Sequence, residues 1–314
     1  MTEIFTAPSP TRPGYVPENS LFDPAPAREP DYLVWRRDKL NQYPTTPDAL
    51  TVTLSGPCEP GTAEHRAVLR ICGRANMVLY RHAAPPTAAT VLQLARAVGL
   101  QQLDVPLYTG EPGVTEIRNI DGGRQGEYAP YTDRALSWHT DGYYNSPAAY
   151  VRGFALHCVR PADVGGESAL LDPEIAYIRL RDHNPEFIAA LMEPDALTIP
   201  ANIENGKEIR ARQTGPVFSV IEGHLHMRFS ARKKYVEWKA GRILADARAF
   251  LRELLDDPDG PVFRHRFSAG EGLICNNVLH TRTAFQDGAG DGRLFLRARF
   301  RDRVAGINEE KGHV

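Results

Sequence analysis

The residues most able to do chemistry are a histidine and an aspartate two positions apart, His139 and Asp141, in the stretch SWHTDG. Side chains two positions apart on an extended strand point to the same face, so this pair can hold one metal ion together. An imidazole and a carboxylate, joined by a second histidine, form the facial triad that leaves three positions open on Fe(II). His280, in the later stretch CNNVLH, can supply that third ligand from the opposite side of a barrel. Alone, the His-x-Asp pair is a weak signal, because a capped surface turn also fits it.

Arginines follow the second histidine at a spacing typical of a strand. In the segment RLFLRARF, a period of two places three arginines on one face, Arg293, Arg297 and Arg299, and Leu294, Leu296 and Phe300 on the other. A guanidinium group is costly to bury without an anionic partner. The row therefore predicts bound anions. Upstream, Ser168 offers a hydroxyl just after the tight turn Gly165-Gly166.

Together, the His-x-Asp pair, the Gly-Gly-x-Ser turn, the distal histidine and the Arg-x-x-x-Arg spacing match a known pattern. The chain resembles the Fe(II)/2-oxoglutarate-dependent dioxygenases of the taurine dioxygenase, clavaminate synthase and γ-butyrobetaine hydroxylase group. The resemblance covers about residues 76–302, and between residues 139 and 172 it is nearest to the γ-butyrobetaine hydroxylase branch. Residues 1–70 lie outside it, and the sequence has no cysteine-rich zinc segment like that of some butyrobetaine hydroxylases.

The resemblance implies a set of cofactors and the residues that bind them. It implies that His139, Asp141 and His280 bind Fe(II), with 2-oxoglutarate and O2 as cosubstrates and succinate and CO2 as products. It implies that Arg293 pairs with the distal carboxylate of 2-oxoglutarate, and that Ser168 adds a hydrogen bond where many relatives have threonine. Halogenating relatives replace the metal-binding carboxylate with a small residue. The presence of Asp141 therefore favours hydroxylation or another oxidative outcome.

Four further residues are candidates for contacts with the primary substrate. Arg297 matches the position that in several relatives meets an anionic group of the substrate, and the alternative is a structural ion pair. Tyr143 can attract a quaternary ammonium group, although packing of the loop explains it better. For Arg228, a substrate contact and a structural ion pair are equally favoured. Asn119 lies at the entrance of a long irregular segment, residues 109–135, which we expect to close over the site as a lid.

The elements that must position these residues are many strands and a few helices. Apolar spacing predicts amphipathic helices, and a capping residue before proline predicts two more helix starts, at Asp172 and Asn184. The expected helices are 32–41, 87–99 and 242–255, and the expected strands include 50–54, 76–81, 114–120, 150–160, 168–171, 217–221, 224–230, 262–267, 273–275 and 293–301. This pattern predicts one β-sandwich or barrel with helical cover.

The resemblance makes the fold class more specific: mainly β with helical insertions, a double-stranded β-helix (jelly-roll) core flanked by α-helices. We expect residues 1–70 to form an N-terminal arm with short lead-in elements. We expect residues 71–314 to form the dioxygenase domain, because no internal repeat or break in composition indicates a second domain.

Composition and charge exclude several classes of partner. The chain has 314 residues, of which 42% are apolar and 24% charged, an ordinary globular balance. Its 37 Lys and Arg nearly balance 39 Asp and Glu, and no basic block predicts binding to nucleic acid or an anionic membrane. No apolar run is long enough for a transmembrane helix, and no secretory signal is recognisable. The four scattered cysteines have neither zinc-type nor disulfide-framework spacing. We therefore expect a cytoplasmic enzyme with a small-molecule substrate.

The favoured function is an Fe(II)- and 2-oxoglutarate-dependent dioxygenase that hydroxylates a small anionic or zwitterionic molecule, such as a carboxylate, betaine, amino acid or sulfonate. One alternative is a non-catalytic jelly-roll protein that binds a metal or small ligand, and another is a metal-dependent isomerase or hydrolase on a cupin-like barrel. Neither alternative needs a complete triad together with Arg293. The identity of the substrate, the oligomeric state, and the choice between hydroxylation, desaturation and carbon–heteroatom cleavage stay open. The N-terminal arm could wrap a neighbouring subunit in a homo-oligomer.

Overall fold

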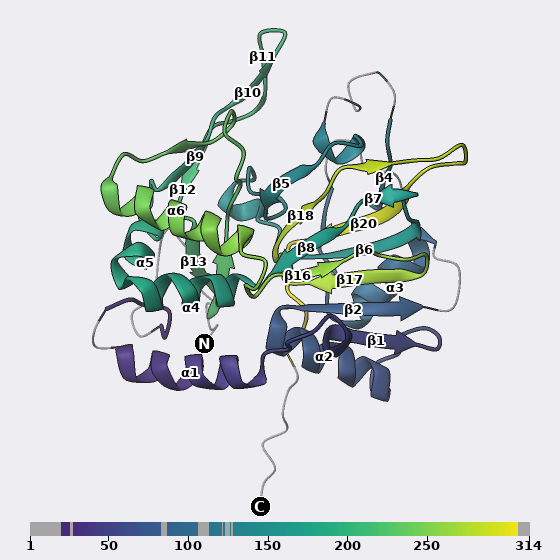
Figure 1. The fold of residues 1–314 in the computed structure, drawn as a ribbon, viewed down its shortest axis with the longest axis horizontal. Helices are drawn as coiled ribbons and strands as arrows, with labels where there is room; N and C mark the ends of the chain where they lie inside the picture. The colour runs from purple at the N-terminus through teal and green to yellow at the C-terminus, as the bar shows by residue number, and fades with distance from the viewer. Residues whose placement is uncertain are drawn as a thin grey trace, which may run out of the picture.

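The computed structural model describes residues 20–25, 28–82, 87–105, 113–120, 122, 126 and 128–306. Two facing β-sheets form its centre, with helices packed outside them (Figure 1). Within the described residues, the larger sheet has seven strands in the order β1-β2-β17-β6-β20-β3, with β4 also paired to β20. These strands are β1 (Thr51–Leu54), β2 (Met77–His82), β17 (Glu271–Cys275), β6 (Gly153–Arg160), β20 (Leu294–Phe300), β3 (Leu103–Asp104) and β4 (Thr115–Ile117).

The smaller sheet carries the strands that the metal ligands were expected to occupy. Its order is β16-β8-β18-β5. The strands are β16 (Phe263–His265), β8 (Ser168–Leu171), β18 (Leu279–Arg282) and β5 (Leu136–His139). Between the two sheets lies a core of buried side chains from both, among them Leu79, Phe154, Leu170, Phe263 and Leu273. Burial of this apolar surface holds the sheets face to face.

Two helices cover the outer face of the larger sheet, α2 (Ala63–Ala75) and α3 (Ala88–Ala97). Each begins at a threonine whose hydroxyl accepts a hydrogen bond from a backbone N–H of the first turn, Thr62 from His65 and Thr87 from Thr90. Such caps satisfy donors that a helix start leaves free. The apolar stripe of α3 predicted this packing, because Val91, Leu92, Leu94 and Ala95 are all buried.

A second core joins the helices α4 (Pro173–His183), α5 (Pro185–Leu191) and α6 (Arg242–Asp256) to the hairpin β13 (Phe218–Ile221) and β14 (His224–Met227). The expected starts of α4 and α5 are confirmed, because the side chains of Asp172 and Asn184 accept the capping hydrogen bonds. The N-terminal helix α1 (Glu29–Gln42) packs on this core through the buried ring of Tyr32. Its Lys39 forms a buried ion pair with Asp172 at 2.7 Å.

Several strands were missed by the sequence analysis. They are β9 (Leu197–Ile199), β10 (Asn202–Glu204), β11 (Lys207–Arg210), β12 (Gln213–Gly215), β15 (Glu237–Trp238), and the short pair β7 (Val164–Gly165) and β19 (Phe285–Gln286). Most are two to four residues long, too short for alternation to be recognised. The larger sheet also starts earlier than the expected domain boundary at residue 71, because β1 pairs with β2 in parallel.

The expected lid, residues 109–135, falls partly outside the described residues. Its described parts include β4, shorter than the strand expected over 114–120, and a short helical turn at Ala129–Tyr131. The backbone N–H of Ile120 donates to the carbonyl oxygen of Tyr131 at 3.0 Å. Among the described residues, no helix is both long and apolar enough to cross a membrane.

Candidate functional site

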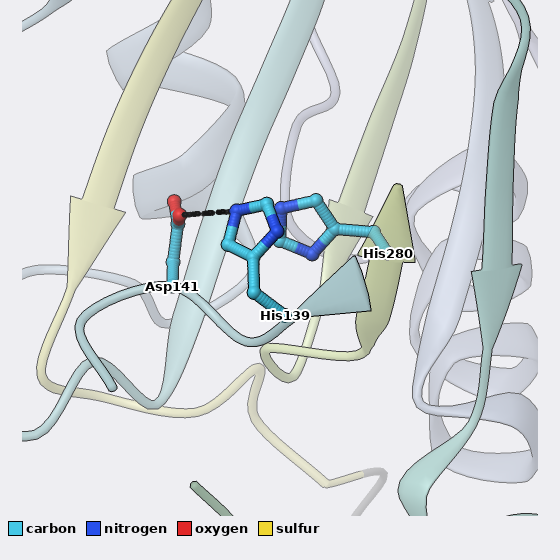
Figure 2. A group of neighbouring side chains, drawn as sticks. All are labelled: His139, Asp141 and His280. Carbon is cyan, nitrogen blue, oxygen red and sulfur yellow. Dashed lines mark ion pairs between the residues drawn. The ribbon is translucent and has the colours of Figure 1, made fainter. Parts of the chain in front are cut away.

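The three predicted metal ligands come together at one end of the smaller sheet. Strands β5 and β18 are antiparallel neighbours in a register that places His139 opposite His280, with their ring centroids 4.2 Å apart. Asp141 lies in the turn after β5 and points toward both rings (Figure 2). Its Oδ1 is 3.7 Å from Nε2 of His139 and 3.9 Å from Nε2 of His280. One ligand atom from each residue lies within 4.8 Å of the others, so the three residues form a group compact enough to hold one metal ion.

Backbone carbonyls orient both imidazole rings. Nδ1 of His139 bonds to the carbonyl oxygen of Ser137 at 2.8 Å, and Nδ1 of His280 to that of Val278 at 2.9 Å. A carbonyl only accepts, so each Nδ1 carries the proton and each Nε2 keeps its lone pair for a metal. Burial lowers the pKa of His139 to about 3 and also lowers the pKa of His280. Both rings are therefore neutral near pH 7, as metal ligands must be.

Asp141 is ionised in spite of its burial. Burial raises the pKa of a carboxyl group, but the neighbouring guanidinium groups of Arg297 and Arg299 outweigh this and hold the pKa of Asp141 well below its usual range. Nη1 of Arg297 lies 3.0 Å from Oδ2 of Asp141. The donor set of two neutral imidazoles and one carboxylate fits an Fe(II) facial triad.

Asn277, which the sequence analysis did not single out, holds the backbone of the metal-binding aspartate. Its Oδ1 accepts from the backbone N–H of Asp141 at 2.8 Å, and its Nδ2 donates to the carbonyl oxygens of Asp141 and Val151 at 2.9 and 2.6 Å. The residue is buried and has φ 53°, a conformation that asparagine tolerates better than most residues. Nothing in the local sequence indicates that this amide reaches Asp141, 136 residues earlier.

The arginine row is confirmed in part. Strand β20 shifts register against β6 between Leu294 and Phe295, so simple alternation holds only from Phe295 onward. Arg297 faces the metal ligands, as its ion pair with Asp141 shows. Arg299 is buried, pairs with Asp104, and donates to the hydroxyl oxygen of Tyr144 at 3.1 Å. The expectation that Arg297 contacts an anion of the substrate stays a prediction, and its observed partner is Asp141.

Arg293 is a buried cation for whose side chain the described residues provide no hydrogen-bond acceptor at Nη1. Its guanidinium lies 3.9 Å from the ring centroid of Phe295 and 5.2 Å from that of Phe285. Its Nη1 is buried without a hydrogen-bond partner among the described residues. Burial first, and then the charge of Arg282, lower the pKa of Arg293 to about 9. A guanidinium held this way needs an anion, which fits the distal carboxylate of 2-oxoglutarate.

The turn expected beside this arginine lies where the sequence placed it. Gly165 and Gly166 have φ 74° and 72°, values that favour glycine, and a Cβ on Gly166 would lie 3.8 Å from Nε of Arg293. Ser168 is buried on β8, in register with Arg282 of β18. Arg282 itself was missed by the sequence analysis. It donates to the carbonyl oxygens of Thr132 and Arg134.

The remaining candidates for substrate contacts have different surroundings. The ring of Tyr143 lies edge-on to that of His139, with centroids 6.4 Å apart, so this residue is beside the metal site. Arg228 is buried and donates to the carbonyl oxygens of Tyr143 and Gly215 at 3.3 and 3.0 Å, and to those of Leu197 and Pro216. These bonds give Arg228 a structural role with backbone carbonyls in place of the ion pair considered above, and its contact with substrate stays a prediction. Asn119 is exposed after β4.

Comparison with known proteins identifies relatives over most of the chain. The family model described as "Taurine catabolism dioxygenase TauD, TfdA family" matches residues 42–299. A uridine-5′-phosphate dioxygenase from Amycolatopsis sp is 28% identical over 273 residues, which cover 78% of this chain and 93% of that protein. A uridine-5′-phosphate dioxygenase from Streptomyces sp is 30% identical over 210 residues, 64% of this chain and 74% of that protein.

Solved structures share the fold at low sequence identity. An asparagine oxygenase in complex with Fe(II), 2S,3S-3-hydroxyasparagine and succinate superposes with a TM-score of 0.55 at 18% identity, covering 80% of this chain and 93% of that one. The PvcB protein from Pseudomonas aeruginosa has a TM-score of 0.53 at 18% identity, covering 81% of this chain and 87% of that one. These likenesses confirm the jelly-roll class with flanking helices.

Proposed function

This chain belongs to the TauD/TfdA dioxygenase family, and from that premise we propose that His139, Asp141 and His280 are its Fe(II) ligands. As a member of the family it is an Fe(II)- and 2-oxoglutarate-dependent dioxygenase, an oxidoreductase. The ligand assignment is supported by the convergence of three donor atoms within 4.8 Å, two of them on neutral rings oriented by carbonyls. This convergence is the observation that carries the proposal.

For the cosubstrate, we propose that Arg293 binds the distal carboxylate of 2-oxoglutarate and that Ser168 adds a hydroxyl hydrogen bond. Support comes from the free Nη1 of Arg293, buried beside the rings of Phe285 and Phe295. These rings exclude water, which strengthens a charged hydrogen bond. The like charge of Arg282 repels the guanidinium of Arg293, and a bound anion would offset this repulsion.

When bound, iron with 2-oxoglutarate and O2 supplies the oxidation of a substrate C–H bond, with succinate and CO2 as products. The residues of the chain prepare the site for this chemistry. His139 and His280 hold their protons on Nδ1 and present Nε2. Arg297 keeps Asp141 ionised and limits how its carboxylate can turn, because Nη1 lies 3.2 Å from Oδ1 and 3.0 Å from Oδ2.

For the substrate, we propose a small phosphate monoester of a nucleoside, with uridine 5′-phosphate as the first compound to test. Two relatives carry that activity in their names, and one of them is matched over 93% of its length. A phosphate ester extends the anionic classes expected from the sequence, which were carboxylates and sulfonates.

Succinate formation tests the proposed substrate. The purified protein is incubated with Fe(II) and 2-oxoglutarate, with uridine 5′-phosphate, uridine, a sulfonate, a betaine or an amino acid. We expect the phosphate ester to raise succinate release at least tenfold over the sample without substrate, with a matching mass increase in the product. If a different compound does so, the substrate is wrong and the enzyme class stands.

The same assay tests the non-catalytic alternative, since binding of Fe(II) without turnover of any compound would support it. We further propose a cytoplasmic location and no nucleic-acid partner, on the basis of a formal net charge of −2 without basic blocks. Fractionation of the source cells and a filter-binding assay with nucleic acid check these two points.

A further inference from the structure

A further cation, Arg210, is linked to the metal site through two tyrosine rings and lies on a segment that the sequence analysis passed over. Arg210 ends β11, which forms a hairpin with β10 in the register Arg210 opposite Asn202. This hairpin projects from the body of the molecule above β9 and β12 (Figure 1), with Arg210 at the end of its second strand. The residue is therefore placed where the hairpin joins the rest of the fold.

Tyrosine rings connect this arginine to the metal ligands. The guanidinium carbon of Arg210 is 5.6 Å from the ring centroid of Tyr144. The ring of Tyr144 meets that of Tyr143 edge-on at 5.2 Å, and Tyr143 meets His139 at 6.4 Å. Both tyrosines are half-buried, so part of each ring is accessible. Arg210, Tyr144 and Tyr143 thus form a continuous series of contacts that ends at His139 of the metal site.

Arg210 has hydrogen-bond capacity that its contacts with the described residues do not use. Its Nη2 donates to the carbonyl oxygen of Pro200 at 2.8 Å and its Nη1 to that of Ala211 at 3.3 Å. A guanidinium has five N–H donors, so Nε and one hydrogen on each Nη remain for another acceptor. The two carbonyl contacts fix the direction of the group without neutralising its charge.

The charge of Arg210 is also uncompensated, in contrast to its neighbours. Within the described part of the chain, no carboxylate lies within ion-pair distance of Arg210, whereas Arg297 pairs with Asp141 and Arg299 with Asp104. Burial lowers the pKa of Arg210, and the groups that oppose this effect are tyrosines and not acids. A half-buried cation without a counter-ion is favourable when a ligand supplies the negative charge.

We propose that Arg210, and not Arg297, binds the anionic group of the substrate, while the rings of Tyr144 and Tyr143 pack along the substrate between that group and the metal site. This inference rests on the proposed function and specifies how its substrate is recognised. A fork of Nε and Nη hydrogens matches two oxygens of a phosphate in bidentate geometry. Arg297 is already engaged by the carboxylate that the metal needs.

Calorimetric titration of the Fe(II)- and 2-oxoglutarate-loaded protein under anaerobic conditions tests the inference through affinity and not through turnover. Uridine 5′-phosphate and uridine are the two probes. We expect Arg210→Gln to raise the Kd for the phosphate ester at least tenfold, and to leave the Kd for uridine within twofold of wild type. Arg210→Lys keeps the charge without the planar fork, so an intermediate Kd is expected.

The matched control is Arg212→Gln, which removes the same charge two residues further along the chain. Arg212 is exposed and pairs with Glu237. The Kd of this variant for uridine 5′-phosphate should stay within twofold of wild type, and the Kd for 2-oxoglutarate should be unchanged in all variants. Equal weakening of the phosphate ester and uridine by Arg210→Gln would overturn the assignment to the anion. An unchanged Kd of Arg210→Gln for uridine 5′-phosphate overturns this inference and leaves the proposed function standing. If wild type binds neither probe, the proposed substrate is wrong and the inference falls with it.

Discussion

Replacing Asn277 with alanine removes the amide that holds the backbone of Asp141. We expect this change to lower both the free energy of unfolding and the affinity for Fe(II), and the two losses can be measured separately. The side chain makes three buried hydrogen bonds, two to Asp141 and one to Val151. At about 1 kcal/mol net for each bond, their loss destabilises the protein by about 3 kcal/mol. The residue has φ 53°, so alanine adds about 1 kcal/mol of backbone strain. The total is about 4 kcal/mol, below the stability of a typical domain.

The same substitution frees the turn that carries the metal-binding carboxylate. Partners that orient metal ligands typically contribute a factor of about 10 to 100 in metal affinity, and we expect a loss in this range for Asn277→Ala. Asn277→Gly removes the same hydrogen bonds but accepts a positive φ freely. It should therefore be about 1 kcal/mol more stable than the alanine variant, with the same loss of metal affinity.

The adjacent residue provides the matched control. Asn276 is also buried, and its side chain bonds to Oδ1 of Asn76 at 3.0 Å and accepts from the backbone N–H of Val304 at 2.9 Å. Asn276→Ala should lower the free energy of unfolding by about 2 kcal/mol without changing metal affinity. Urea unfolding and anaerobic Fe(II) titration measure the two quantities. The reasoning is refuted if Asn277→Ala binds Fe(II) as tightly as wild type, or if both alanine variants weaken binding equally.

Three other outcomes are expected. Arg293→Gln should raise the Kd of 2-oxoglutarate by about 10- to 100-fold, because a charged hydrogen bond of about 1.5–3 kcal/mol is lost. Ser168→Ala should raise this Kd less. Unchanged calorimetric binding of 2-oxoglutarate to Arg293→Gln would show that another arginine binds the distal carboxylate. Fe(II) should raise the Tm of the wild-type protein, and EDTA should reverse this rise. Asp141→Ala should show neither the rise in Tm nor succinate formation. Full activity of Asp141→Ala would contradict the metal assignment. Burial lowers the pKa of His226 to about 3, so below pH 6.5 the unfolded chain takes up a proton that the folded protein excludes, and the free energy of unfolding falls as the pH drops from 6.5 toward 3. His226→Gln should reduce the slope of the free energy of unfolding against pH by about 1.4 kcal/mol per pH unit. An unchanged slope in urea unfolding would argue that His226 is protonated in the folded state.

Local patterns predicted much of the fold. The starts of α4 and α5 were predictable because a capping side chain and a proline act within one turn of the chain. The helix α6 was predictable because its apolar residues recur on one face, and Leu244, Ala247, Leu251 and Leu255 are buried. The strands β9 to β12 were not predictable, because each is three or four residues long and pairs only with other short strands.

Among the site residues too, those whose role depends on nearby sequence could be predicted, and those whose role depends on distant segments could not. His139 and Asp141 were recognisable because they lie two positions apart, although β5 ends at His139 and Asp141 lies in the turn that follows, and not on the extended strand that the sequence analysis assumed. Asn277 was not, because its role depends on hydrogen bonds to a residue 136 positions away. For Arg228 the sequence left a substrate contact and a structural ion pair equally favoured, and only the fold shows that backbone carbonyls from other segments surround its guanidinium.

The sequence by itself determined the chemistry that the chain can offer: two imidazoles, a carboxylate, a hydroxyl after a glycine turn and a row of arginines. Only the tertiary structure decided which of these groups meet. The pairing of β18 with β5 sets His280 across from His139, and the register shift in β20 separates the surroundings of Arg293 from those of Arg297. The physical reason is that strand register depends on packing between segments distant in the chain, whereas side-chain chemistry belongs to each residue alone.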